Sequence, residues 1–307
     1  MSVLILIGFN RPEFTIKQVN KLIHHPKLFD EIYLYIDGAR ENNESDLLNQ
    51  SKIRNFLQNK SKEGSINFHF NQYNLGLTEH IVTAISAVLE KHSSVVVLED
   101  DVEFDINSLR SIKNQLDVIT IEKMLNPVIG MSGLSKQKYF SFAPHNKWRT
   151  SKYFCAWGYG INREFWKMHL NYHYEKKKAS TAELNPNDKP KRKVRIWEER
   201  FNRKIYDYEI QESMYKFQIR AIAPRFRIVG NLGHGPDSTH TKFATPKYLR
   251  RPLDNRLLAP RIDFKTLKTV ERVILDFMDS KTFGGDSIFS VRGRTFGIRS
   301  LFRSLLK

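Results

Sequence analysis

Three consecutive acids, Glu99-Asp100-Asp101, directly follow the apolar run at residues 95–98. Adjacent carboxylates at the end of a buried strand repel one another unless a cation compensates their charge. Mg²⁺ or Mn²⁺ suits such oxygen ligands, because these ions take one or two carboxylates and complete their shell with phosphate oxygens and water. The triplet therefore predicts a divalent-metal site, against the alternative of a solvated turn with helix-capping acids.

Polar residues also follow the other apolar runs of the first half. Asn10 and Arg11 come after the first run, and Asp37 comes after the second with a glycine behind it. These side chains can contact a base, ribose or phosphate, although helix initiation and a type I turn explain them as well. Asn74 and Gly76 precede a predicted helix, whose free N-terminal amides favour phosphate.

Two glycine-rich or aromatic stretches lie further along the chain. The loop at residues 229–241 holds His234 and His240 among three glycines, which suits a diphosphate or metal site or an ordinary glycine turn. The stretch with Trp157, Gly158 and Tyr159 offers an aromatic platform for a sugar or base, but core packing is the usual role of such rings.

Acids that could serve as a general base cluster just ahead of residue 224. Asp207, Glu209 and Glu212 lie within seven residues of sequence that also reads as a solvated helix face. Both interpretations stay open at this point.

The elements that must position these residues alternate between strand and helix. Continuous apolar runs predict buried strands, and apolar residues at helical spacing predict the helices between them. We expect strands at residues 3–7, 32–36, 66–70 and 95–98, and helices that begin at Pro12, span residues 47–57 and are capped by Thr78. This order predicts an α/β fold with a mainly parallel sheet, helices on both faces and one cleft beyond the carboxyl ends of the strands.

The second half is less regular. We expect a helix near residues 107–124, a strand near 128–131, a partly mobile basic segment at 176–204 and an amphipathic basic helix at 294–307. The last helix either lies on an anionic membrane or packs on the rest of the protein.

Composition narrows the class of protein. The 307 residues carry a formal net charge of +17, which favours polyanionic partners such as phosphorylated substrates, anionic lipid or nucleic acid. A single cysteine excludes an intrachain disulfide and a cysteine-based zinc site, and it favours a cytoplasmic location. No apolar run is long enough to span a bilayer, and the N-terminus reads as a strand and not as a signal peptide.

An ordered set of motifs resembles the GT-A-fold sugar-nucleotide glycosyltransferases, especially inverting enzymes of the N-acetylglucosaminyltransferase I type and family 2-like transferases. The resemblance covers roughly residues 3–245. It rests on Phe9-Asn10-Arg11-Pro12, Asp37-Gly38, Asn74-Leu75-Gly76-Leu77, Val97-Leu98-Glu99-Asp100-Asp101, Trp157-Gly158, Asn231-Leu232-Gly233 and Thr239-His240-Thr241.

The resemblance implies a domain at residues 1–245, with a nucleotide-binding half at 1–105 and an acceptor half at 106–245, and a helical basic extension at 246–307. The acidic triplet would be a DXD-type motif in which Asp101 binds Mn²⁺ or Mg²⁺, and His240 would contact the metal or the diphosphate. Asp207 would be the catalytic base, and Glu209 is the second candidate for that role. The acceptor would be contacted by Trp157, Gly158 and Tyr159. The nucleotide sugar would be held by Asn10, Arg11, Asp37, Asn74, Gly76, Leu77, Glu99 and Asp100.

The resemblance implies transfer of a sugar from a nucleotide diphosphate to a hydroxyl group of a glycan or lipid-linked acceptor in cell-surface polysaccharide synthesis. The nucleotide expected from the family is UDP. The location implied is the cytoplasm, with peripheral contact at the inner face of the membrane. Two alternatives remain. A sugar-phosphate nucleotidyltransferase would want a glycine-rich basic loop after the first strand, which this chain lacks, and a basic nucleic-acid-binding protein would want a binding signature that is not found.

Overall fold

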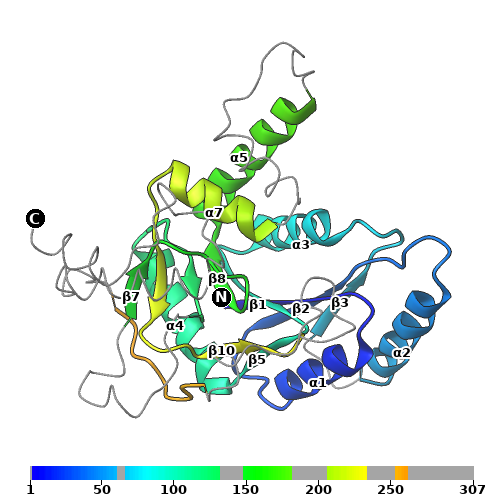
Figure 1. The fold of residues 1–307 in the computed structure, drawn as a ribbon. Coiled ribbons are helices and arrows are strands. Elements are labelled where there is room, and N and C mark those ends of the chain that lie inside the picture. Colours follow the sequence, from blue (N-terminus) through cyan, green and yellow to red (C-terminus); the bar gives the residue numbers. More distant parts are fainter. Residues whose placement is uncertain (1, 61–65, 132–147, 182–205, 234–252, 262–307) are drawn as a thin grey trace, which may run out of the picture.

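An eight-stranded sheet forms the centre of the protein (Figure 1), in the order β3-β2-β1-β4-β8-β6-β9-β7. The computed structural model describes residues 2–60, 66–131, 148–181, 206–233 and 253–261. The strands are β1 (Val3–Gly8), β2 (Glu31–Ile36), β3 (Ile66–Phe70), β4 (Ser94–Glu99), β6 (Val128–Ile129), β7 (Trp148–Ser151), β8 (Tyr159–Asn162) and β9 (Ala221–Pro224). A separate two-stranded sheet pairs β5 (Val102–Phe104) with β10 (Val229–Asn231).

Helices cover both faces of the large sheet. One face packs on α1 (Pro12–Ile23), α2 (Glu44–Lys60) and α4 (Ile106–Ile121), and the other on α3 (Leu77–Lys91), α5 (Arg163–Thr181) and α7 (Tyr206–Lys216). Strand β1 shows why the run is apolar throughout. Leu4 and Leu6 enter the first hydrophobic cluster while Ile5 and Ile7 enter the second, so a polar residue on either side would be buried. The predicted α/β class is confirmed.

The parallel arrangement holds for the first four strands in the sheet and then changes. Strands β3, β2, β1 and β4 pair in parallel, whereas β8 is antiparallel to both β4 and β6, and β7 is antiparallel to β9. Only β6 and β9 pair in parallel among the later strands that the structure describes. The sheet is therefore mixed, with its continuous parallel part built from strands of the first half of the chain.

Helix α3 begins one residue before the predicted cap. Gly76 occupies the N-cap position with a φ of 76°, and Thr78 lies inside the helix. A positive φ is readily adopted by glycine, so the backbone turns at Gly76 and the threonine hydroxyl is not needed as a cap.

Several predictions fall wholly or partly outside the described residues. Residues 176–181 of the basic segment belong to α5, while the rest of that segment, the predicted helix at 294–307 and His240 lie outside the described residues.

Residues 253–261 run along α4, where the Leu258 amide donates to Ser111 Oγ at 2.9 Å and the Leu258 side chain enters the core. The domain boundary at residue 245 stays a prediction. Among the described helices, none is both long and apolar enough to cross a membrane.

Candidate active site

The loops that follow β1, β2 and β4 meet at one edge of the sheet. Backbone bonds join them directly, because the Asp37 amide donates to Gly8 O at 3.1 Å and the Asp100 amide donates to Ile7 O at 2.9 Å. Parallel neighbouring strands place their carboxyl ends at the same edge, so residues far apart in the sequence come together. The convergence of Arg11, Asp37 and the acidic triplet that the sequence predicts is present.

In the structure, the Arg11 guanidinium forms ion pairs with two acids of the triplet. Arg11 Nη1 donates to Asp101 Oδ2 at 2.9 Å, and Arg11 Nη2 donates to Asp100 Oδ1. Burial alone would lower the pKa of Arg11, but the two carboxylates raise it above its ordinary value, so the guanidinium is charged. Burial raises the pKa of Asp100 to about 6, and the charge of Arg11 opposes that rise.

Asp101 is also held from the other side, by the end of β10 and the residues after it. Asn231 Nδ2 donates to Asp101 Oδ1 at 3.2 Å, and the Leu232 amide donates to Asp101 O at 2.8 Å. Gly233 lies so close that a Cβ there would be 2.0 Å from Asp101 Oδ2. The Asn231-Leu232-Gly233 motif therefore packs directly on the third acid of the triplet.

Glu99 lies in a second cluster with residues from β8 and α7. Tyr206 donates its hydroxyl proton to Glu99 Oε1 at 2.7 Å. Burial, followed by the charge of Asp101, raises the pKa of Glu99 to about 8, and Asp207 is near enough to contribute to that rise. Burial also raises the pKa of Asp207 itself to about 6. The structure thus brings the predicted base Asp207 near one of the predicted donor-binding acids, Glu99.

Glu209 faces a different neighbour although it lies only two residues after Asp207. Its Oε2 accepts a hydrogen bond from His173 Nδ1 at 2.6 Å, and Lys176 Nζ lies 3.7 Å from its other oxygen. Both of these residues belong to α5. Hydrogen bonding to His173 and the charge of Lys176 outweigh burial and lower the pKa of Glu209. Its carboxylate is thus committed to the contact between α5 and α7.

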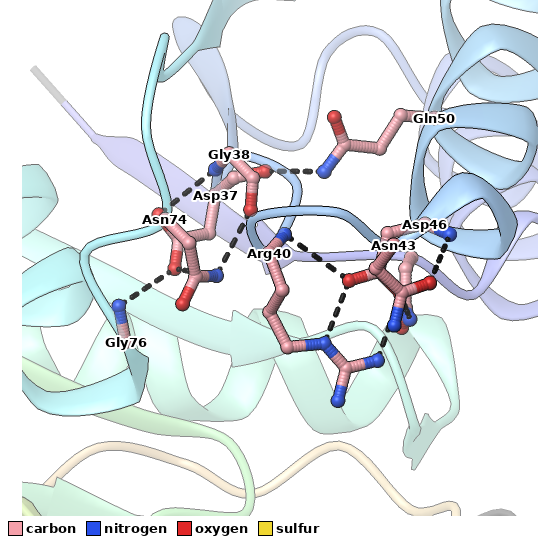
Figure 2. Close-up of polar contacts among 9 residues, drawn as sticks. Asp37, Gly38, Arg40, Asn43, Asp46, Gln50, Asn74 and Gly76 are labelled. Carbon is pink, nitrogen blue, oxygen red and sulfur yellow. Dashed lines mark hydrogen bonds and ion pairs between the residues drawn. The ribbon is translucent and has the colours of Figure 1, made fainter.

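Asp37 organises the loops around it (Figure 2). Its two carboxylate oxygens accept five hydrogen bonds of 2.9–3.0 Å, from the amides of Gly38, Leu75 and Gly76 and from the side chains of Asn71 and Asn74. Figure 2 shows Asp37 with Gly38, Asn74 and Gly76. The residue is 4% exposed. In this arrangement Asp37 ties the loop after β2 to the loop before α3, and the Leu75 and Gly76 amides are already bound to it. Contacts of Asp37, Asn74, Gly76 and Leu77 with a nucleotide stay a prediction.

Gly38 makes this tie sterically possible. A Cβ at Gly38 would lie 2.2 Å from the carbonyl carbon and 2.3 Å from the carbonyl oxygen of Tyr73. Real Cβ atoms do not approach backbone so closely, so only glycine lets the two loops pack in this way.

Sequence reasoning missed Asp46, which anchors the loop residues Asn10 and Arg40. Its oxygens accept from Asn10 Nδ2 at 2.6 Å and from Arg40 Nε and Nη2 at 2.7 and 2.8 Å, and Figure 2 shows the pair with Arg40. The hydrogen bonds from Arg40 lower the pKa of Asp46. The Asp46 amide donates to Asn43 Oδ1 at 3.0 Å, so the spacing Asn43-x-x-Asp46 at the start of α2 was the signal available in the sequence.

The residues predicted to contact an acceptor lie beside the end of β4, because Tyr159 pairs with Val97 in the register of β8. The Tyr159 ring is fully buried and packs edge-on against Phe154 at 4.9 Å between centroids. Gly158 has a φ of 66°, and a Cβ there would be 3.2 Å from Val229. Trp157 is partly buried against the core. Acceptor contacts by these three residues stay a prediction.

The donor atoms present fit a substrate-assisted metal site and not an all-protein cage. Within the described ranges, no group of three or more His, Cys, Asp or Glu side chains is arranged to hold a metal ion. Asp101 offers a single carboxylate, and Mg²⁺ or Mn²⁺ is commonly bound by one or two carboxylates with phosphate oxygens and water completing the shell. A metal bound jointly by Asp101 and a diphosphate is consistent with this donor set.

No family model matches the chain, and no curated protein sequence matches it. Solved structures that resemble it include the mannosyltransferase PcManGT from Pyrobaculum calidifontis with GDP-Man and Mn²⁺, at 12% identity over 53% of this chain and 44% of that one, with a TM-score of 0.37. GalNAc-T7 with UDP, GalNAc and Mn²⁺ aligns at 13% identity over 81% of this chain and 46% of that one, with a TM-score of 0.48. The 4-diphosphocytidyl-2C-methyl-D-erythritol synthase from Anaerococcus prevotii aligns at 12% identity over 74% and 89% of the two chains, with a TM-score of 0.33.

The chain spans less than half the length of the first two of these structures. Both are glycosyltransferases, the class that the sequence motifs resemble, and the third makes a nucleotide-linked product. Each TM-score is below 0.5, so the evidence for a function lies in the residues of this chain.

Proposed function

We propose that this protein is a metal-dependent, inverting GT-A glycosyltransferase that moves a sugar from a nucleotide diphosphate to a hydroxyl group. The observation that carries the proposal is the meeting of Arg11, Asp100 and Asp101 at the carboxyl edge of the sheet, with Asp207 close to Glu99 beside them. Cleavage of a sugar–phosphate bond requires positive charge for the leaving diphosphate, carboxylates for a metal ion and a base for the acceptor hydroxyl. These three kinds of group lie close together here.

Donor binding would use the loops after β1, β2 and β3. Arg11 contacts Asp100 and Asp101 and is charged throughout the physiological range, so it suits the diphosphate. Asp46 fixes Asn10, and Asp37 fixes the loop with Asn74 and Gly76, so the walls around a nucleotide are set before it binds. Preorganised walls of this kind lower the entropic cost of binding.

Mn²⁺ or Mg²⁺ would be held by Asp101, with His240 as a second ligand implied by the family resemblance. A bound ion would supply positive charge to stabilise the diphosphate as it departs. Glu99 and Asp100 would face the ribose and the sugar.

Asp207 is our choice for the catalytic base. Burial raises its pKa to about 6, so near neutral pH it is ionised yet more basic than an ordinary aspartate. In the proposed step the acceptor oxygen attacks the anomeric carbon while Asp207 takes the hydroxyl proton. The bond from that carbon to the phosphate oxygen breaks, and its electron pair leaves with the nucleoside diphosphate, which inverts the configuration.

The finer assignments are a UDP donor and a glycan or lipid-linked acceptor in surface polysaccharide synthesis. The single cysteine suits a cytoplasmic enzyme, and the net charge of +17 suits peripheral contact with the anionic inner face of a membrane.

A screen of nucleotide sugars with Mn²⁺ tests the class of reaction. We expect one donor to give a metal-dependent rise in melting temperature and to release nucleoside diphosphate, and Asp101→Ala to abolish both while keeping the fold. Glu103→Gln is the matched control, because Glu103 is an exposed acid only two residues further on. Pyrophosphate release from a nucleoside triphosphate and a sugar phosphate would instead favour the nucleotidyltransferase. Tight RNA or DNA binding without any nucleotide-dependent shift would favour the nucleic-acid binder.

The base assignment is tested by comparing Asp207→Asn with Glu209→Gln. Both changes remove one carboxylate charge from the same helix, but only Asp207 lies near Glu99. We expect a large loss of turnover with unchanged donor affinity for the first variant, and near-normal turnover for the second. The reverse pattern would move the base to Glu209.

A further inference from the structure

Arg11 makes a forked contact that spans two carboxylates of the acidic triplet. One Nη donates to Asp100 and the other to Asp101, although these acids lie about ninety positions further along the chain. The Asp100 side chain is 1% exposed and that of Asp101 is 10% exposed, whereas the Arg11 side chain is 28% exposed. Two nearly buried acids are thus paired with one arginine, which compensates one of their two negative charges and whose outer part still reaches solvent.

The surroundings of Asp101 leave little room beside this arginine. Asn231 occupies Oδ1, and a Cβ on Gly233 would be 2.0 Å from Asp101 Oδ2 and 3.2 Å from Arg11 Nη1. The backbone at residue 233 therefore covers the contact between Arg11 and Asp101. A divalent cation that approaches the same carboxylate would meet the guanidinium charge at close range, in surroundings that screen charge poorly.

From this arrangement we infer that Arg11 is the resident counter-ion of Asp100 and Asp101, and that it couples binding of the metal to binding of the nucleotide diphosphate. The inference rests on the proposed function and deepens it. Without nucleotide, Arg11 keeps free Mn²⁺ from Asp101. A diphosphate offers the guanidinium a second set of anionic oxygens, so the arginine turns toward the phosphates and the carboxylate becomes available to the metal.

The coupling is reciprocal, as linkage requires. If the diphosphate raises the affinity for Mn²⁺ by some factor, Mn²⁺ raises the affinity for the diphosphate by the same factor. The physical advantage is that Asp101 always has a cationic partner, which is Arg11 before the nucleotide binds and the metal ion afterwards.

The test measures Mn²⁺ binding directly, from the electron paramagnetic resonance signal of free Mn²⁺, on wild type, Arg11→Lys and Arg11→Gln. Without nucleotide we expect Arg11→Gln to bind Mn²⁺ at least about ten-fold more tightly than wild type, within the usual range of coupling between sites. Lysine keeps the charge but reaches only one carboxylate, so its affinity should lie between the two. Melting curves confirm that each variant is folded. Should Arg11→Gln not fold, the comparison of Arg11→Lys with wild type carries the test.

Adding UDP completes the measurement. In wild type we expect UDP to raise Mn²⁺ affinity by a larger factor than in Arg11→Gln, whereas uridine, which has no phosphate, should have little effect on either. If wild type binds Mn²⁺ with UDP but both variants bind Mn²⁺ alone no more tightly than wild type does, the coupling role of Arg11 is refuted and the proposed function stands. If wild type binds neither Mn²⁺ nor nucleotide, the proposed function falls and this inference with it.

Discussion

Replacing Asp37 by asparagine distinguishes a structural carboxylate from a nucleotide ligand. In the structure one carboxylate oxygen accepts three hydrogen bonds and the other accepts two. An asparagine keeps one oxygen, so its best orientation preserves the three bonds and turns its NH₂ group toward the donors of Asn74 and Gly76. The hydrogen bonds that Asn74 Nδ2 and the Gly76 amide donate to Asp37 are then lost at a residue that is 4% exposed, and Asn74 Nδ2 keeps its bond to Gly38 O.

The magnitude follows from these two lost bonds. A hydrogen bond to a charged group contributes about 1.5–3 kcal/mol, so Asp37→Asn should lower the free energy of unfolding by about 3–6 kcal/mol. That is a large part of the roughly 5–15 kcal/mol that stabilises a typical protein. Urea unfolding measures it as a lower midpoint at an unchanged m value.

Asp117→Asn is the matched control, since it makes the same chemical change at a partly exposed position. Among the described residues, the ion pair of Asp117 is with Lys113 at 3.1 Å on one turn of α4, so about 0.5 kcal/mol or less should be lost. An Asp37→Asn protein that unfolds within about 1 kcal/mol of wild type would refute the structural reasoning. If the same protein also bound nucleotide poorly, Asp37 would be a direct ligand.

Three further predictions concern backbone packing and titration. Gly38→Ala would push a Cβ to 2.2 Å from the Tyr73 backbone, so we expect about 1–3 kcal/mol of destabilisation, and an unchanged melting temperature would contradict this. Burial lowers the pKa of His169 from 6.5 to about 4, so this histidine takes up a proton in the unfolded chain at a higher pH than in the folded protein. The free energy of unfolding should therefore decrease by about 3 kcal/mol as the pH is lowered from 6.5 to 4. His169→Gln should lack this part of the pH dependence in urea unfolding, and identical slopes for both proteins would contradict the assignment. If Asp207 is the base, kcat/KM should decline about ten-fold per pH unit below its pKa of about 6, and a decline that begins only near pH 4 would exclude it.

Sequence patterns located the elements of the first half well because their signals are local. The continuous apolar run of β1, the proline at the start of α1 and the helical spacing in α3 all coincide with the observed elements. The start of α3 was predicted less well. Thr78 is a good cap by residue type, but the positive φ of Gly76 starts the helix earlier.

Contacts between distant loops were harder to predict. Asp46 was not recognised as a partner of Asn10, because that hydrogen bond spans thirty-six positions and the local spacing Asn43-x-x-Asp46 indicates only the start of a helix. The same limit applies to Tyr206, which donates to Glu99 on another element. Each of these contacts depends on which helix faces lie against the sheet edge.

By itself, the amino-acid sequence determined that three acids end a buried strand and that polar loops follow the neighbouring strands, since strand and helix periods are properties of short segments. Only the tertiary structure decided that Arg11 pairs with those acids and that Asp207, and not Glu209, lies near Glu99. It also decided that the Asp37 carboxylate is hydrogen-bonded by the neighbouring loop residues. The physical reason is that charge compensation and hydrogen bonding act over a few ångströms in space, and the packing of the sheet and helices determines which residues come that close.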